Sequence, residues 1–348
     1  MVMFWVSLLA ISILLYVLLD GVDLGVGLLF GLANGEERRA GMLSAVAPIW
    51  DGNETWLVIT AVILWGAFPV VYATLLSAFY LPLIVMLLGL ILRGVAFEFR
   101  YKTQRLRWIW DLSFAGGSLI ATFIQGMTVG ALVEGLQFTN GQYSGGEVGW
   151  LTPFAVLCGI GLCLGYALLG ACWLAKKCEA EIRDVAHRQI PVLAMGVLAF
   201  LVAVFAYALA ENLPILERWI DRPYLFVFPA IGAVAAAVLA LSILRHDDHR
   251  PFYTVALIFI SAFGTLALSF WPYMIPFLIT VDQAAAPQIQ PYVHVLGLRG
   301  DRLSTDADLH AHQLQGLQGQ GRNNRRALNW HFPDLTQVPF FGRCRRAS

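Results

Sequence analysis

Residues 3–33 read MFWVSLLAISILLYVLLDGVDLGVGLLFGLA, and this stretch decides the fold class. It contains only two charged side chains, Asp20 and Asp23, and it exceeds the roughly 20 apolar residues that a helix needs to cross a bilayer. No basic segment precedes it and no small-residue cleavage motif follows it. We therefore interpret it as a first membrane helix and not as a signal peptide.

The whole chain shares this apolar character. Of its 348 residues, 58% are hydrophobic and 13% are charged, which is about half the charged fraction of a soluble domain. Basic and acidic residues balance at 23 each, a pattern that argues against nucleic-acid binding. The five cysteines form no C-x-x-C pair, so neither a disulfide scaffold nor a metal site is indicated. These features predict an all-α polytopic membrane protein.

Apolar segments and basic loops together predict the membrane topology. Eight transmembrane helices are expected near 3–33, 54–75, 77–100, 109–134, 151–175, 189–211, 224–244 and 252–281. Twelve Lys and Arg residues fall in loops 34–44, 100–108, 176–188 and 245–251, against only Arg218 and Arg222 in the opposite loops. Because cytoplasmic loops are rich in basic residues, we expect these four loops inside and the N-terminus outside.

The last sixty residues have a different composition. From about Ile289, Gln, Arg, His and Asp replace the aliphatic residues, and no further span can be drawn. A disordered tail is one interpretation. We favour a frameshift near codons 286–291, because a one-base shift of one back-translation of residues 312–321 gives a lysine-rich segment typical of a cytoplasmic terminus. On this hypothesis 288–348 is an aberrant tail.

Charged side chains inside predicted spans are candidate functional residues, because they are costly to insert. Asp20 and Asp23 lie three positions apart and therefore on one helix face. Further candidates, some of them uncharged, belong to a polar turn at 48–56 and to the ends of the third and fourth spans: Trp50, Asp51, Asn53, Trp56, Arg93, Glu98, Arg100, Lys102 and Asp111. Carboxylates near cations in a low dielectric suit a proton path.

Charge pairing between helices is the alternative for each of these groups. Glu98 and Lys102 stand at i,i+4, where pairing is common. Asp111 follows Trp110 at a helix start, which favours N-capping or helix-dipole pairing over chemistry. For Asp51 and Glu98 a functional and a structural role are equally supported. The shared face of Asp20 and Asp23 favours a function, because packing alone does not explain two acids there.

The seven histidines all fall outside the expected spans. The chain therefore offers no axial histidine for a haem embedded in the membrane.

Several motifs resemble those of subunit II of the cytochrome bd-type quinol oxidases. The segments that carry the resemblance are DGVDLGVG at 20–27, APIWDGNETWL at 47–57, LRGVAFEFR at 92–100, QGMTVG at 125–130, PYMIP at 272–276 and AAAP at 284–287. The resemblance covers about 1–287. The tail departs from it, because the family ends in a ninth helix and a basic terminus, and that helix is expected to be lost here.

The resemblance implies an architecture and an activity. It implies two four-helix bundles, at 1–135 and 136–287, in a heterodimer with a subunit I that holds two haems b and haem d. Such a complex oxidises ubiquinol and reduces oxygen to water at the bacterial inner membrane, with this chain's N-terminus in the periplasm. A small single-helix subunit is a further expected partner, and nucleic acid is not.

The resemblance also implies roles for residues. Lys102, Glu98 and Asp51 would be stations of a proton path from the cytoplasm, supported by Asp20 and Asp23. Interface or structural roles are expected for Trp50, Asn53, Trp56, Arg93, Arg100 and Asp111. No metal ligand is expected in this chain.

Two other functions remain open from the sequence. A proton-coupled secondary transporter is disfavoured, since such folds place sites at broken helices of inverted repeats and no repeat is visible. A passive scaffold, in which the acids only hold helices together, is the second.

Overall fold

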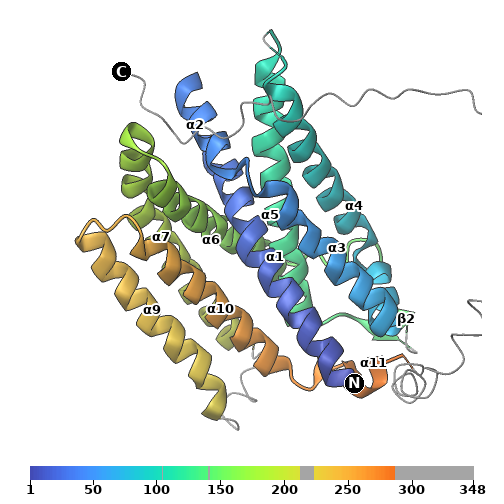
Figure 1. Cartoon of the computed structure of the whole chain (residues 1–348). Coiled ribbons are helices and arrows are strands. Elements are labelled where there is room, and N and C mark those ends of the chain that lie inside the picture. Colours follow the sequence, from blue (N-terminus) through green and yellow to red (C-terminus); the bar gives the residue numbers. More distant parts are fainter. Residues whose placement is uncertain (104, 140–141, 212–222, 287–348) are drawn as a thin grey trace, which may run out of the picture. The chain divides into compact units, whose positions relative to one another are not determined.

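A computed structural model describes residues 1–103, 105–139, 142–211 and 223–286, and this part of the chain is mostly helical (Figure 1). Val2–Ala286 forms one compact unit. The predicted frameshifted tail, 288–348, lies outside the described residues, so that hypothesis stays a prediction.

The elements follow one another in a simple order. They are α1 (Val2–Phe30), α2 (Glu36–Val46), α3 (Trp50–Ala67), α4 (Pro69–Arg100), α5 (Arg107–Glu134), β1 (Phe138–Thr139), β2 (Gln142–Tyr143), α6 (Pro153–Lys177), α7 (Ala180–Ala210), η1 (Pro223–Phe226), α9 (Val227–Leu244), α10 (Arg250–Phe270), β3 (Tyr273–Ile275), β4 (Ile279–Thr280) and α11 (Val281–Ala284). The strands form two antiparallel pairs, β1 with β2 and β3 with β4.

Seven helical segments of the described part are long and apolar enough to cross a membrane. They comprise α1, α4, α5, α6, α7, α10 and the segment Tyr224–Leu244. α3 corresponds to the remaining expected span, but it has only 18 residues and carries Asp51 and Glu54 near its start. The multi-pass helical class is thus confirmed, whereas the eighth crossing and the two-bundle division stay predictions.

Several expected spans have different boundaries in the structure, and two places differ most. The span expected at 54–75 is interrupted at Phe68 (φ −133°, ψ 57°), and Pro69 opens α4. Proline suits a helix start, because its missing N–H would be unpaired there anyway. The span expected at 252–281 was too long: α10 ends at Phe270, and the β3–β4 hairpin follows the Trp271–Pro272 step.

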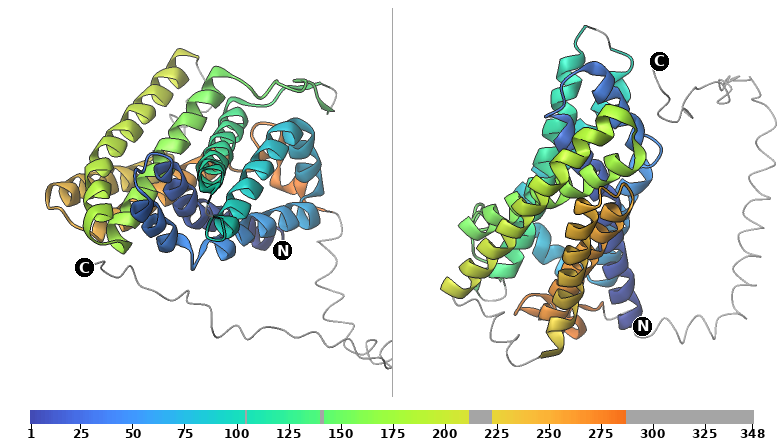
Figure 2. Two further views of the ribbon diagram at one scale, coloured as in Figure 1. Left: turned by 90° about the horizontal axis from the view of Figure 1, so that it is seen from above. Right: turned by 90° about the vertical axis from the view of Figure 1, so that its left-hand side faces the viewer.

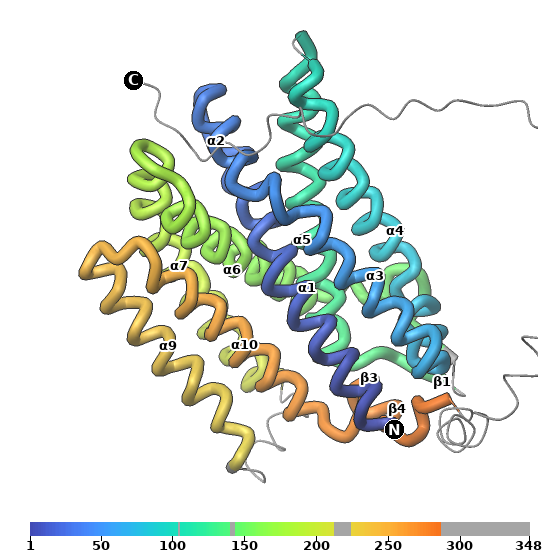
Figure 3. Tube along the Cα trace, in the orientation of Figure 1, coloured from blue at the N-terminus to red at the C-terminus, as the bar shows by residue number. Residues whose placement is uncertain are grey.

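α1 packs against α3, α5 and α6, while α4 packs on α5 and α9 on α10 (Figure 2). The hairpin and α11 lie beside the start of α1 (Figure 3), where the Ala286 N–H donates to the Ala67 carbonyl over 3.1 Å. α1 and α6 approach closely because glycines face each other: a Cβ on Gly25 would lie 1.9 Å from the Tyr166 carbonyl oxygen. Small residues at such crossings let two backbones touch.

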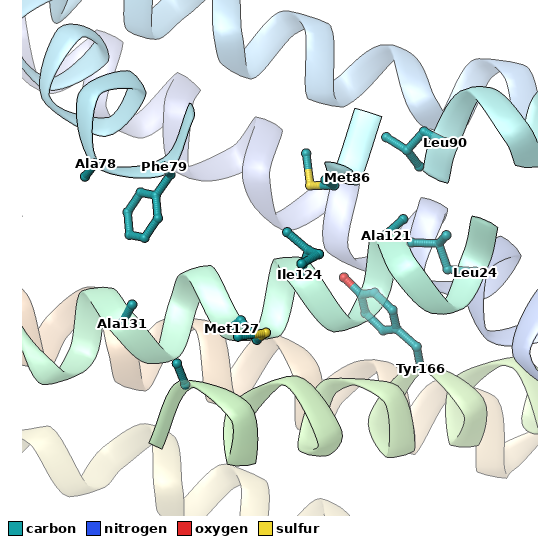
Figure 4. Close-up of a cluster of buried hydrophobic side chains, with 11 residues drawn as sticks. Leu24, Ala78, Phe79, Met86, Leu90, Ala121, Ile124, Met127, Ala131 and Tyr166 are labelled. Carbon is teal, nitrogen blue, oxygen red and sulfur yellow. The ribbon is translucent and has the colours of Figure 1, made fainter. Parts of the chain in front are cut away.

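The apolar core lies between α1, α4, α5 and α6. Figure 4 shows its buried side chains, Leu24, Ala78, Phe79, Met86, Leu90, Ala121, Ile124, Met127, Ala131 and Tyr166. Tyr166, which is fully buried, extends its hydroxyl toward α5. The core therefore contains polar atoms at the level of the acids on α1.

Candidate functional site

The two acids predicted to share a face of α1 are both buried. Asp20 is 0% exposed and Asp23 is 2% exposed. At 1.5 Å per residue they lie about 15 and 10 Å from the end of the helix at Phe30. They are therefore deep within a membrane-spanning helix, where an ionisable group requires partners.

Arg93 on α4 provides the partner for Asp20. Its Nη1 lies 2.7 Å from Asp20 Oδ1, and its Nη2 lies 3.2 Å from Glu54 Oε2 on α3. The side chains of Arg93 and Asp20 are 2% and 0% exposed, whereas that of Glu54 is 31% exposed. One guanidinium thus joins three helices through two carboxylates, and charge-assisted bonds of this kind are the strong ones.

Asp23 has a neutral partner instead. The Asn53 side-chain amide donates to Asp23 Oδ2 over 2.8 Å and lies 3.3 Å from the Leu19 carbonyl oxygen. Within the described residues Asp23 forms no ion pair. Asp23 Oδ1 and Asp20 Oδ2 are buried without a hydrogen-bond partner in that part of the chain. Each acid therefore keeps one oxygen free to bind a proton or water.

Three further polar side chains continue from this cluster through the core. Gln125 on α5 donates from Nε2 to the Tyr16 hydroxyl over 2.6 Å, and the Tyr166 hydroxyl donates to Gln125 Oε1 over 3.3 Å. Both tyrosines are buried. Neither tyrosine was among the predicted site residues, although Tyr16 precedes Asp20 by four positions and so shares its helix face.

A second charged network lies where α2, α4 and α5 meet. Asp111 accepts from Arg100 Nε over 2.5 Å and from Arg39 Nη1 over 2.8 Å. Glu36 accepts from Arg100 and Arg107, each over 2.8 Å. The N-capping role considered for Asp111 is wrong, because α5 begins at Arg107 after Leu106. Asp111 instead pairs with two guanidiniums.

A phenylalanine layer, defined by Phe30, Phe97 and Phe114, separates the two charged groups. The Phe30 ring has the guanidinium carbons of Arg39 and Arg100 5.5 and 5.4 Å from its centroid. Its centroid is 5.1 Å from that of Phe114, which lies 6.1 Å from that of Phe97. All three side chains are at most 5% exposed. On α4, Phe97 falls between Arg93 and Arg100, so this layer divides the buried cluster from the outer network.

The proposed proton-path residues occupy two different settings. Asp51, Glu98 and Lys102 are exposed, and none forms an ion pair within the described ranges. Lys102 Nζ lies 5.8 Å from the Phe99 ring centroid. The structure thus brings two groups of predicted residues together: Asp20, Asp23, Asn53 and Arg93 form one, and Arg100 and Asp111 form the other. The predicted proton-path residues Asp51, Glu98 and Lys102 lie at the surface.

The two tryptophans of α3 were predicted to have structural or interface roles. Trp50 packs on Phe97 with ring centroids 5.0 Å apart, and Trp56 is half-buried. The site residues that sequence reasoning missed beside them are Glu54, Glu36 and Arg39. Glu54 had a signal, since it stands between the two indoles of the 48–56 segment.

The described histidines do not fit a haem site in the membrane core. His187 lies within α7, which begins earlier than the expected span at 189, and its Nε2 is 2.7 Å from Asp248 Oδ1. His246 and His249 lie between α9 and α10. Among the described residues, no group of three or more His, Cys, Asp or Glu side chains could hold a metal ion.

Comparison with known proteins decides the family. Residues 1–296 match the family model of cytochrome bd terminal oxidase subunit II. The chain belongs to this family. The resemblance noted at 1–287 is thereby confirmed, and the motifs of this subunit II family at 20–27 and 47–57 supply Asp20, Asp23 and Asn53 of the buried cluster.

Relatives from several bacteria support this membership. The chain is 33% identical over 308 residues to cytochrome bd-I ubiquinol oxidase subunit 2 of Escherichia coli K12, covering 78% of this chain and 81% of that protein. It is 31% identical over 278 residues to cytochrome bd ubiquinol oxidase subunit 2 of Bacillus subtilis 168, covering 76% and 81%. A chain of the bd oxidase from Geobacillus thermodenitrificans shares the fold, with a TM-score of 0.70, 14% identity and coverage of 92% and 99%.

Proposed function

We propose that this chain is subunit II of a bd-type terminal oxidase, which oxidises quinol and reduces oxygen to water in the respiratory chain. The observation that carries the proposal is the family match over residues 1–296. The names of the relatives from Escherichia coli and Bacillus subtilis, which are ubiquinol oxidase subunits, support ubiquinol as the substrate. The seven apolar segments support a multi-pass position in a bacterial membrane.

In this proposal the redox centres belong to a partner. Subunit I holds haems b and d and supplies electron transfer and oxygen chemistry when bound. The placement of the described histidines supports this assignment, because they lie at helix ends or pair with an acid. A small single-helix subunit completes the proposed assembly, and the basic loops support a periplasmic N-terminus.

The proposed contribution of this chain to chemistry is proton transfer from the cytoplasm. Asp51 precedes Glu54 by three positions on α3 and so shares its face. Glu54 bonds to Arg93, which bonds to Asp20. Asp51 therefore leads toward the buried cluster along one helix face. Glu98 and Lys102 are exposed on this chain and would deliver protons only where a partner subunit covers them.

Within the cluster the two acids have different proposed tasks. Asp20 pairs with a buried guanidinium and thereby holds Arg93 and Glu54 in position. Asp23 faces a single amide donor and keeps Oδ1 unpaired within the described part of the chain. Asp23 is therefore the group we expect to receive and release the proton.

Replacing Asp23 tests this division. We expect Asp23→Asn in the purified complex to slow quinol-driven oxygen consumption and proton uptake by about 10²-fold or more, the usual cost of losing a proton-transfer group. Asp184→Asn is the matched control, because Asp184 is exposed on α7. Haem spectra verify assembly. Full turnover in an assembled Asp23→Asn complex would leave the acids with a scaffold role only.

A scaffold role is supported independently for the second network. Asp111 and Glu36 each accept from two guanidiniums, so their charges are compensated between α2, α4 and α5. We propose that Arg100 and Asp111 hold these helix ends together and carry no protons. Trp50, Asn53 and Trp56 keep their proposed structural or interface roles.

A further inference from the structure

Two buried side chains of α1 and α5 each have an oxygen without a hydrogen-bond partner. They are Asp20, through its Oδ2, and Thr122, through its Oγ1, counted over the part of the chain that the structure describes. Both residues are 0% exposed. A buried polar atom without a partner costs free energy, and native proteins satisfy nearly all such atoms with protein groups or ordered water. These two oxygens therefore point to a ligand.

Thr122 differs from its hydroxyl neighbours on α5. Ser118 donates to the Phe114 carbonyl over 2.8 Å, and Thr128 donates to the Ile124 carbonyl over 2.9 Å. This bond to the carbonyl four residues earlier is common for a Ser or Thr within a helix. The Thr122 hydroxyl makes no such bond to any described residue. It is therefore available to a group outside its own helix.

Contacts between α1 and α5 place these two oxygens at the same level. A Cβ on Gly27 would lie 2.0 Å from Ser118 Oγ, and Gln125 bonds to the Tyr16 hydroxyl. The acid stands four residues after Tyr16 and seven before Gly27, so it shares their face of α1. The threonine stands four residues after Ser118 and three before Gln125 on one face of α5. Both therefore lie between the same two contacts.

The Tyr16 hydroxyl adds a donor at this level. Its oxygen accepts from Gln125 Nε2 over 2.6 Å, and Gln125 Oε1 accepts from the Tyr166 hydroxyl over 3.3 Å. The amide thus fixes the Tyr16 oxygen as an acceptor, and the tyrosine's own proton can be donated to a third group. Tyr16 is 6% exposed, so this third group also lies inside the protein. One water can bridge polar groups that do not touch directly.

We propose that one ordered water binds between α1 and α5, where it accepts from the Tyr16 and Thr122 hydroxyls and donates to Asp20 Oδ2. Three polar partners are the usual number for a buried water. This water holds the second oxygen of an acid whose first oxygen is bound by a guanidinium. Its role rests on the proposed proton transfer, because it keeps the geometry of the cluster fixed while Asp23 takes up and releases a proton.

High-resolution electron cryo-microscopy of the purified complex tests the site directly. We expect density for one water within about 3 Å of the Tyr16 hydroxyl, Asp20 Oδ2 and Thr122 Oγ1. Thr122→Val removes the hydroxyl and should lose this density. It should also lower the temperature of thermal inactivation by about 2–4 °C, the effect of roughly one lost hydrogen bond in a large domain. Thr128→Val is the matched control, because its hydroxyl bonds to its own helix, and it should keep the density.

The sign of the Thr122→Val effect decides between a bound water and an unsatisfied hydroxyl. Without a water, the substitution removes an unsatisfied polar atom and leaves the complex as stable as wild type or more stable. That result, or a wild-type map without density at this place, would overturn the proposal. If Thr122→Val fails to assemble, Thr122→Ser must retain the water, and its loss there refutes the site. Neither readout measures turnover, so this proposal and the proton-transfer proposal can fail independently.

Discussion

Replacing Arg93 by methionine would measure how much stability the complex loses when one partner of the buried ion pair is removed. The substitution keeps an apolar stem but removes bonds of 2.7 Å to Asp20 and 3.2 Å to Glu54. Glu54 is 31% exposed and can be rehydrated, whereas Asp20 is 0% exposed and cannot. The cost therefore comes mainly from Asp20, and breaking one side of a buried pair typically destabilises by about 3–5 kcal/mol.

The assay is thermal inactivation of the purified complex, followed by the haem spectrum and by size-exclusion chromatography. Arg93→Met should lower the midpoint strongly, and adding Asp20→Asn should recover most of the loss, because the stranded charge is then removed. Arg183→Met is the control, since its partner Asp248 is 3.7 Å away and exposed, and such pairs contribute about 0–1 kcal/mol. If the double variant is no more stable than Arg93→Met, Asp20 is not the charge that Arg93 compensates.

Two further substitutions test the packing and the hydrogen bonding around the acids. Gly25→Ala should prevent α1 from packing on α6 and abolish assembly of the complex, since the new Cβ would lie 1.9 Å from the Tyr166 carbonyl oxygen. Gly52→Ala is the control, because nothing lies within 4 Å of the Cβ added there, and this variant should assemble normally. Equal yields of assembled complex from the two variants would contradict the close approach of α1 and α6. Asn53→Leu should destabilise the complex by about 1–3 kcal/mol in chemical unfolding, because Asp23 loses its donor; an unchanged unfolding midpoint would show that this bond is not needed.

Hydrophobic runs were sufficient to predict the helices but not where two of them end. The segment from α3 into α4 is apolar without interruption, and only Pro69 marks the break at Phe68. The segment 273–280 is also apolar, so composition does not distinguish a short hairpin from a last helical turn. In both places a proline marks the helix boundary, but the apolar residues on either side make the segment resemble one continuous span.

The site was predictable to the extent that spacing defines a helix face. Three-residue spacing placed Asp20 and Asp23 together, and both are buried as expected. Spacing does not reveal which residue of a helix face reaches a partner on a neighbouring helix. Glu54 contacts Arg93, whereas Asp51, on the same face of α3, is exposed at the helix start. Contacts between distant segments, such as Tyr16 with Gln125, require the folded chain.

The phenylalanine layer has a consequence for the direction in which protons can travel. Arg93 and Arg100 are seven residues apart on α4, about 10 Å along its axis, and the rings of Phe30, Phe97 and Phe114 fill the level between them. A straight route from the outer network to Asp23 would therefore have to pass these apolar rings. For the proton transfer proposed above, the partly exposed Glu54 offers a lateral entry instead. That entry opens on a flank of the helices, so in this proposal a neighbouring subunit would have to cover it.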